Sequence, residues 1–281
     1  MIIIITFVFL ILFKKFYNLL LKKHTRELSL PKIRILLAKN KDVEIVSGSK
    51  NQLNINYNSI EKNVSKILIK NNILNIDDEI IDNTNNIYIN STHFYLNKEK
   101  YFGQIQIIFE GDDIYYINHI HLEKYLYNVV TSEVYSFWPI ESLKAQAVVS
   151  RTYALRKMKK YKNYKFDLYA SIKSQKYSGN IIINKKIIEA VNATENIIIS
   201  YNNKIINAVY HSCSGGITEF SDSVWGKQLP YLNSVIDIYI NSPYLKWKEE
   251  INIDKIKEKF LNNDDLVDIF VSKKSKTGRV H

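Results

Sequence analysis

The sequence predicts an α+β fold in which strand-rich segments flank a central unit of two helices. Between residues 31 and 119, short runs of alternating apolar and polar residues are separated by clusters of Asn, Asp and Gly, a pattern typical of strands and turns. At His121 the apolar spacing changes to the period of a helix, and a second helical segment follows Pro139. These three observations place the helices in the middle of the chain.

The predicted strands come first. They are indicated by the runs KIRILLA (32–38), VEIVSG (43–48), LNINY (53–57), NIYINSTHFYLN (86–97) and FGQIQIIFEGDDIYYINHI (102–120). Side chains that are β-branched or aromatic favour strands because they pack well on a pleated surface. The same region shows no long helical period, so we expect it to form sheets.

The first predicted helix carries a glutamate at the end of its apolar face. In HLEKYLYNVVTSEV (121–134), the spacing i, i+4, i+7 and i+11 is occupied by Leu122, Leu126, Val129 and Glu133. Residues at this spacing share one side of a helix. We therefore expect the Glu133 carboxyl group at the end of a buried stripe, next to an aromatic loop.

The second predicted helix begins after Pro139 and spans IESLKAQAVVSRTYALRKMKK (140–160), which is rich in good helix formers. Its buried side is expected to hold Leu143, Ala147, Ala154 and Met158. Its polar positions include Lys144, Gln146 and Arg151.

Composition limits the possible classes of protein. A chain of 281 residues with 46% hydrophobic content can bury a sizeable core. The net charge of +11 indicates an anionic partner, although a composition rich in Ile, Asn, Lys and Tyr explains the same charge as genomic bias. The single cysteine, Cys213, excludes an intramolecular disulfide and a zinc site with several cysteines.

The N-terminal sequence resembles a membrane anchor or an export signal. A run of twelve mostly apolar residues, 2–13, precedes Lys14 and Lys15, and a second apolar patch follows. The run is short for a spanning helix but typical of a signal segment, and no small-residue cleavage site follows it. We expect residues 1–30 to be an uncleaved anchor or signal-like segment, with a buried strand as the alternative. Lysines after the run favour a cytoplasmic domain, which conflicts with export.

Long motifs in the chain are similar to those of a known family. LEKYLYNVVTSEVYSFWPIESLKAQAVVSRTYAL (122–155) resembles the signature of the stage II sporulation protein D (SpoIID/LytB) family. Further matches follow in the family's order: SQKYSG (174–179), YHSCSGGITEFSDSVWG (210–226), PYLNSV (230–235) and TGRV (277–280). The strand YFGQIQI (101–107) has Phe102 where the family has arginine. The resemblance covers roughly residues 33–281, and we expect one domain, 31–281, that is truncated at its C-terminus.

The resemblance implies a lytic transglycosylase that cleaves peptidoglycan glycan strands without stem peptides and leaves 1,6-anhydro-muramyl ends. The substrate's own C6 hydroxyl attacks, so a single carboxyl group can act as acid and then as base, without the second carboxylate of a hydrolase. We expect Glu133 to be this group. Phe137 and Trp138 are expected to desolvate it, which favours the protonated form of the acid.

The expected substrate-binding residues are Lys144, Gln146, Arg151, Gln175, Tyr177, Ser212, Ser214 and Thr218. Each muramic acid carries a lactyl carboxylate, to which the Arg151 fork offers two hydrogen bonds. Alternatively, Lys144 and Arg151 are solvated helix charges and Tyr177 packs in the core. Glu141, at a helix start, is expected to be structural. We expect the active cleft where the Glu133 loop faces the 212–218 loop.

Zinc, thiol and nucleic-acid chemistry are less consistent with the sequence. A zinc site is conceivable from the pairs His119 and His121, and His211 and Cys213, although strand-end histidines are the simpler explanation. Cys213 and His211 make a weak nucleophile pair because no orienting acid is indicated. Nucleic-acid binding rests on charge alone. We therefore expect no metal, no cofactor and no nucleic-acid partner.

A second class of function stays open: a non-catalytic, glycan-binding protein that activates a cell-wall amidase. In either class the expected partners are peptidoglycan strands and the membrane, the latter through the N-terminal segment. With these partners, we expect a bacterial domain that faces the cell wall, outside the cytoplasm.

Overall fold

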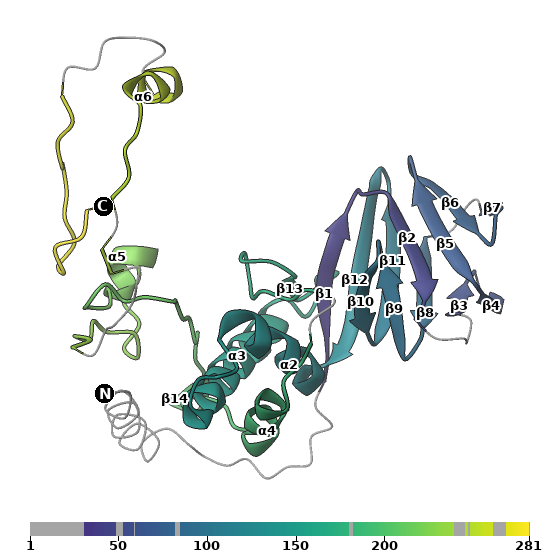
Figure 1. Cartoon of the computed structure of the whole chain (residues 1–281), viewed down its shortest axis with the longest axis horizontal. Coiled ribbons are helices and arrows are strands. Elements are labelled where there is room, and N and C mark those ends of the chain that lie inside the picture. The colour runs from purple at the N-terminus through teal and green to yellow at the C-terminus, as the bar shows by residue number, and fades with distance from the viewer. Residues whose placement is uncertain are drawn as a thin grey trace. The chain divides into compact units, whose positions relative to one another are not determined.

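A computed structural model describes residues 31–48, 53–58, 60–81, 85–179, 182–238, 245–246, 248–260 and 268–280. The chain divides into two compact units, one ending at Val209 and the other beginning at Tyr210, and each is described by itself (Figure 1). The predicted anchor, residues 1–30, lies outside the described residues. Within those residues, no helix combines the length and the apolar character needed to cross a membrane.

Two mainly antiparallel sheets dominate unit 1. Their strands before the helices are β1 (Lys32–Lys39), β2 (Val43–Ser47), β3 (Leu53–Tyr57), β4 (Ile60–Val64), β5 (Lys66–Lys70), β6 (Ile73–Ile76), β7 (Glu79–Ile81), β8 (Asn86–Asn90), β9 (His93–Leu96), β10 (Glu99–Phe102), β11 (Gln104–Glu110) and β12 (Asp113–His121). With β13 (Leu168–Tyr169), which pairs in parallel with β1, the seven-stranded sheet has the order β13-β1-β12-β11-β8-β3-β4. The six-stranded sheet has the order β10-β9-β2-β5-β6-β7.

Asparagine and aspartate make the tight turns of these sheets. Asn71 and Asn72 (φ 51° and 63°) join β5 to β6, and Asp77 and Asp78 (φ 47° and 69°) join β6 to β7. Two-residue hairpins that match the strand twist require positive φ at both positions, which these side chains tolerate best after glycine. The Asn-rich composition therefore supports a fold that has few glycines.

Both large sheets contribute to one hydrophobic core. Ile33 and Ile35 of β1, Ile45 of β2 and Ile67 of β5 are fully buried and belong to the same cluster. On several strands the buried residues alternate with more exposed ones, for example in Leu53–Tyr57, so one face of the strand packs inward. The predicted sheet-forming region is confirmed.

Three helices gather beside the end of β12 (Figure 1). They are α2 (Leu122–Glu133), α3 (Ile140–Lys160) and α4 (Lys185–Ala193). Helix α2 follows β12 without a loop and contacts α3, α4 and β1. The buried side of α3 includes Leu143, Ala147 and Ala154, as predicted, and Met158 packs against the core from a half-buried position.

The predicted α+β class is confirmed, but the strands gather on the N-terminal side of the helices. Beyond α3, the strands within the described residues are only two residues long: β13, β14 (Ser200–Tyr201) and β15 (Lys204–Ile205). Unit 2 contains the short helices α5 (Ser221–Trp225) and α6 (Ile253–Phe260) and the isolated bridge Ile217–Ile236. The motifs at 210–226, 230–235 and 277–280 lie mainly in loops. Their polar side chains form hydrogen bonds with nearby backbone, and they do not show the alternation of buried and exposed residues that is typical of strands.

Candidate active site

Glu133 is the last residue of α2. The predicted stripe of Leu122, Leu126 and Val129 is buried, as are Tyr125 and Val130. The expected burial of Glu133 is not found, because its side chain is exposed. The helix ends there, at an extended Val134 (φ −137°), so the chain turns outward and the carboxyl group projects beyond the buried stripe.

The carboxylate of Glu133 is held through one of its two oxygens. The backbone N–H of Lys176 donates a hydrogen bond of 2.9 Å to Oε1. No described residue is hydrogen-bonded to Oε2. One oxygen is therefore anchored, while the other has no hydrogen bond to a described residue and is available to carry or receive a proton.

The segment that supplies this N–H is clamped along α2. Asn128 donates from Nδ2 to the carbonyl of Ser178 at 2.6 Å, and its Oδ1 accepts the Ser178 N–H at 3.1 Å. Gly179 follows, and a Cβ there would lie 2.6 Å from Cβ of Glu99, so only glycine fits. Asn128 and Gly179 thereby fix the position of Lys176 relative to Glu133.

Three aromatic residues follow Glu133 and are largely exposed. Tyr135, Phe137 and Trp138 are 64%, 77% and 40% exposed. The Tyr135 and Phe137 rings stack with their centroids 5.3 Å apart, and the centroids of the Tyr135 and Trp138 rings are 6.3 Å apart. Lys186 of α4 donates to the Trp138 carbonyl and ties the loop to the helices. These residues form an exposed apolar surface beside the carboxylate, which we call the aromatic loop.

Arg151 lies inside the helical layer. Its side chain is fully buried, and its guanidinium forms two hydrogen bonds with the Glu123 carboxylate, at 2.7 and 2.6 Å. It also donates to the carbonyls of Ile197 and Val191 at 3.2 Å. The sequence interpretation of Arg151 as a glycan ligand is therefore corrected, because the buried side chain joins α3 to α2, to α4 and to the segment after α4.

Two other residues predicted to contact sugar are buried in unit 1 and hydrogen-bonded there. Gln175 is buried and accepts from the Tyr125 hydroxyl at 3.1 Å. The buried Tyr177 donates to Oδ1 of Asn118 at 2.8 Å, and burial raises the pKa of its hydroxyl. Both side chains therefore support the site from the core, in place of the predicted contacts with sugar.

Two polar side chains of α3 bond to neighbours on the same helix. Lys144 is paired with Glu141 at 2.8 Å, and Gln146 donates to Ser150 Oγ at 3.0 Å. The structural role predicted for Glu141, at the start of α3, agrees with this ion pair. Lys144 keeps a partly exposed side chain, so it remains a candidate for contact with substrate.

Ser212, Ser214 and Thr218 lie in unit 2. Ser212 is exposed, Ser214 donates to Asp237 at 2.7 Å, and Thr218 pairs with the backbone of Val235. The expected cleft between this loop and the Glu133 loop stays a prediction, since it joins two units.

Unit 2 also contains a bonded cluster around Glu219. Its carboxylate accepts from Ser275 at 2.5 Å and from Thr277, and these hydrogen bonds lower the pKa of Glu219 to about 2. Arg279 reaches back to the carbonyls of Ser214 and Ile217. The TGRV motif thus fastens the 212–218 loop within unit 2.

Residues 110–201 match the family model described as SpoIID, stage II sporulation protein. This range contains Glu133, the aromatic loop and the Lys176 segment. We call residues 110–201 the SpoIID domain, after the family model that they match. The SpoIID match ends before Tyr210, so it lies within unit 1.

Several curated proteins resemble the chain around its SpoIID domain. An uncharacterised protein of Brachyspira hyodysenteriae is 32% identical over 60% of this chain and 45% of its own length. Stage II sporulation protein D of Bacillus subtilis is 34% identical over 42% of this chain and 39% of its own. The amidase enhancer of the same species is 32% identical over 49% of this chain and 18% of its own. The matches therefore span less than half of each relative.

The histidines of the SpoIID domain have structural surroundings. His119 contacts Oε1 of Gln106 at 2.9 Å through Nε2, and its ring lies edge-on to Tyr88. Burial, aided by the charges of Arg34 and Lys32, lowers its pKa to about 4. His121 is exposed at the end of β12. Among the described residues, no three His, Cys, Asp or Glu side chains gather as metal ligands.

Sequence reasoning missed two features of the SpoIID domain. The Lys176 contact is made by a backbone N–H, which any residue type at that position provides, so no side chain could indicate it. Asn128 occupies a polar position of α2 that reads as solvent-facing. Tyr135, Phe137 and Trp138 were visible as a cluster, but their exposure depends on where α2 ends.

Proposed function

We propose that this protein is a lytic transglycosylase that cleaves bacterial peptidoglycan strands, with Glu133 as its single acid and base. One observation carries the proposal: an exposed carboxylate, anchored through Oε1 alone, lies next to an exposed aromatic loop. The SpoIID match across this region supports it. Strands without stem peptides are the proposed substrate.

The chemistry requires one proton carrier. Protonated Glu133 gives its proton from Oε2 to the oxygen of the glycosidic bond, whose bond to the sugar carbon breaks. The C6 hydroxyl of the same sugar then forms a bond to that carbon and returns its proton to Glu133, which closes the 1,6-anhydro ring. The group is regenerated, and no water is consumed.

The substrate itself must supply part of the environment. In the free protein Glu133 is exposed, and a glycan strand laid across the aromatic loop would remove water from the carboxyl group and favour its protonated form. Exposed aromatic rings offer apolar faces to sugar rings, and an exposed apolar cluster commonly marks a binding surface. The aromatic loop is accordingly assigned to glycan binding.

Further contacts are proposed from unit 2. Ser212, Ser214 and Thr218 of unit 2 are proposed to contact the glycan strand. Because the proposed substrate is cell-wall glycan, we also propose that the domain faces the cell wall, outside the cytoplasm. Residues 1–30 are the proposed membrane attachment.

Product analysis tests the proposal. Purified protein is incubated with glycan strands from which an amidase has removed the peptides, and the digest is analysed by mass spectrometry. Anhydro-muramyl ends are expected from the wild type. Glu133→Gln keeps the shape but cannot transfer the proton, so product formation should fall by at least ~100-fold. Near-normal turnover by this variant would remove Glu133 from the mechanism.

A second function is favoured by the similarity to the amidase enhancer of Bacillus subtilis. In that case the protein binds denuded glycan and raises the rate of a cell-wall amidase without cutting the strand. The same digests distinguish the two: retained glycan binding without anhydro ends, together with faster peptide release by an added amidase, supports the enhancer role.

A further inference from the structure

The densest run of positive charge in the sequence lies where α3 ends. Six of the ten residues 156–165 are Lys or Arg, against 39 of 281 in the whole chain. No Asp or Glu occurs between Glu141 and Asp167. We call residues 156–165 the basic turn. A general bias of composition would spread lysines evenly, so this density needs an explanation of its own.

Most of these cations have no acidic partner. Lys165 is paired with Glu110 at 2.7 Å, and Arg156 donates to the carbonyl of Ile205 at 3.1 Å, which leaves its charge in place. No ion pair within the described part of the chain is formed by the other four, Lys157, Lys159, Lys160 and Lys162. Cations favour the C-terminal end of a helix, but Lys162 lies beyond α3, so helix stability explains only part of the charge.

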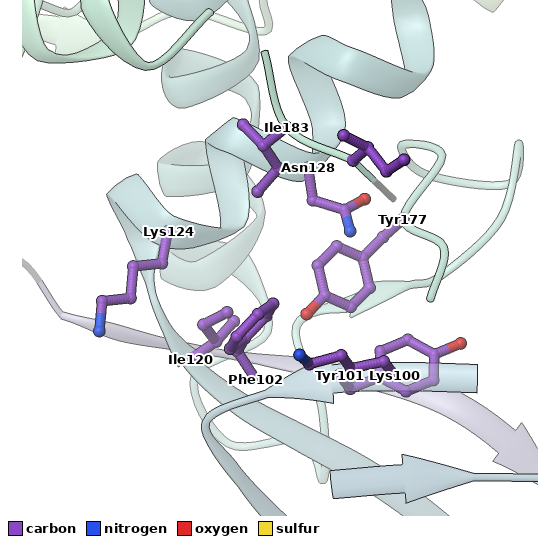
Figure 2. A pocket seen from close by; sticks show the side chains of 9 residues that line it. Lys100, Tyr101, Phe102, Ile120, Lys124, Asn128, Tyr177 and Ile183 are labelled. Carbon is purple, nitrogen blue, oxygen red and sulfur yellow. The ribbon is translucent and has the colours of Figure 1, made fainter. Parts of the chain in front are cut away.

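The cavity beside α2 carries less positive charge. Figure 2 shows this cavity, of about 290 Å³, and its two lysines, Lys100 of β10 and Lys124 of α2. In the basic turn, six cations follow one another along one segment. The basic turn is therefore the better candidate for contact with an extended anionic surface.

Tyrosine rings lie among the lysines of the basic turn. Nζ of Lys157 and Nζ of Lys160 lie 5.8 and 5.0 Å from the centre of the Tyr161 ring. That ring is edge-on to the ring of Tyr164, with centroids 5.2 Å apart, and Tyr164 is 64% exposed. These contacts join the two lysines and the two rings into one surface. Long lysine stems and tyrosine rings suit the boundary between lipid and water, because each combines an apolar body with a polar tip.

Arg34 of β1 holds the backbone of the basic turn. Its guanidinium donates to the carbonyls of Tyr161 at 2.9 Å and Tyr164 at 2.5 Å, and it is paired with the buried Asp167 at 2.7 Å. Arg34 is thereby used within unit 1 and is not part of the binding surface. A backbone that is already fixed loses less conformational entropy when its side chains bind a partner.

The aromatic loop and the basic turn lie at opposite ends of α3. The loop precedes Ile140, the first residue of the helix, and the 21 residues of α3 span about 30 Å. β1 begins at Lys32, about 7 Å along the strand before Arg34, so residues 1–30 lead into unit 1 near the basic turn. A membrane bound by the basic turn would leave the other end of α3 open to a glycan strand.

We propose that the basic turn binds the phosphate headgroups of an anionic phospholipid membrane, and that this contact holds the aromatic loop at the end of α3 remote from the membrane. The inference rests in part on the membrane attachment proposed for residues 1–30. Phosphate-containing wall polymers share the headgroup chemistry. The exposed Tyr164 ring and the nearby entry of residues 1–30 favour the lipid surface.

Quenching by lipid tests the proposal on the full 281-residue chain. With Cys213 replaced by serine, Asn163→Cys carries a fluorescent label at an exposed position of the basic turn, and lipids with spin-labelled headgroups quench it on contact. We expect strong quenching in vesicles that contain anionic lipid and weak quenching in neutral vesicles. Raising the salt from about 0.1 to 1 M should reverse it, because the Debye length falls from about 10 to 3 Å. Equal quenching in both kinds of vesicle, or none in anionic ones, overturns the proposal.

Charge variants locate the contact. Lys159→Gln, Lys160→Gln, Lys162→Gln changes three exposed side chains and should lower the ratio of bound to unbound turn by up to about 100-fold. Each lysine near an anionic surface contributes roughly a fivefold factor. The matched control removes the same net charge at exposed positions on other segments and should leave quenching unchanged: Lys41→Gln, Lys70→Gln, Lys124→Gln. Equal losses in the two triple variants would show that net charge alone governs binding, which refutes the site.

Two further measurements separate this proposal from its neighbours. Retention of the wild type on neutral vesicles tests residues 1–30, and anhydro ends in the glycan digests test Glu133, so either can fail while the basic turn still binds. A soluble poly(glycerol phosphate), added to anionic vesicles at equal phosphate concentration, should leave most of the quenching. Complete loss of quenching would identify a wall polymer as the ligand and overturn the assignment to lipid.

Discussion

The backbone N–H of Lys176 donates a 2.9 Å hydrogen bond to Oε1 of Glu133, across 43 residues of sequence. The bond joins the end of α2 to a segment that is itself clamped to α2 by Asn128. An exposed carboxylate would otherwise sample several rotamers, and this bond restricts the Glu133 side chain to rotamers that keep Oε1 at the Lys176 N–H. The relationship makes the 175–179 segment part of the site, although it contributes only backbone at this point.

Asn128→Ala is expected to lower the rate of glycan cleavage while the protein stays folded. The substitution removes two hydrogen bonds to Ser178 and lets the Lys176 N–H shift, and a displacement of about 1 Å near a reacting group costs up to ~100-fold in rate. The measurement is kcat and KM on denuded strands, beside a thermal melt. A positioning role predicts a lower kcat with little change in KM.

Asn192→Ala serves as the matched control for Asn128. Asn192 accepts a 2.7 Å hydrogen bond from Tyr127 of α2, but it contacts neither Ser178 nor Lys176 among the described residues. Its loss should leave kcat near the wild-type value. Similar losses in both variants would point to general loosening of α2 and against a specific role for Asn128.

Removing the two stacked rings of the aromatic loop should weaken substrate binding. Phe137→Ala, Tyr135→Ala deletes side chains that are mostly exposed, so the melting temperature should change little. If each ring packs on a sugar with roughly 0.5–1.5 kcal/mol, the two together contribute about 1–3 kcal/mol, and KM should rise by about 5- to 150-fold at similar kcat. Ile172→Ala, at a residue that is 93% exposed, is the control. An unchanged KM would remove the aromatic loop from the glycan site.

Arg151→Ala should destabilise the protein strongly. It leaves Glu123 without its buried partner, and breaking a buried ion pair costs about 3–5 kcal/mol. Arg156→Ala, on the same helix but exposed, with a single bond to the Ile205 carbonyl, should cost far less. Urea unfolding of both variants makes the comparison. A stable Arg151→Ala variant that had lost only glycan binding would restore the ligand role predicted from the sequence.

The stability of unit 1 should depend on pH through His119. Its pKa is about 4 in the folded chain and 6.5 in the unfolded chain, so the unfolded chain binds more protons between these values. The free energy of unfolding should therefore fall as pH drops from about 6.5 to 4, and the His119 contribution should be complete above 6.5. Unfolding of wild type and His119→Gln across this range measures the difference, which should shrink as pH falls.

His121→Gln controls for the general effect of acid. His121 lies two residues further along, where its side chain is exposed, so this variant should follow the wild-type pH dependence. If His119→Gln and wild type keep a constant difference from pH 7 to 4, the burial of a neutral His119 does not contribute to the acid sensitivity.

The sequence by itself determined the local structure around the candidate site. Alternating runs predicted the sheets, because a strand with one buried face must alternate, and the i, i+4, i+7 stripe predicted α2 and the position of Glu133 at its end. The long motif around that stripe indicated the family from residues alone, and the match to residues 110–201 agrees with it.

Only the tertiary structure decided which polar side chains face substrate. Arg151 and Gln175 read as glycan contacts, yet both are buried, because α2 and α4 close over α3 and offer partners that lie 28 to 50 residues away. Glu133 reads as buried but is exposed, because its helix ends at that residue. Which side chains are buried, and which lie close together, depends on packing between segments that are far apart in the chain. The spacing of residues within one segment carries no information about that packing.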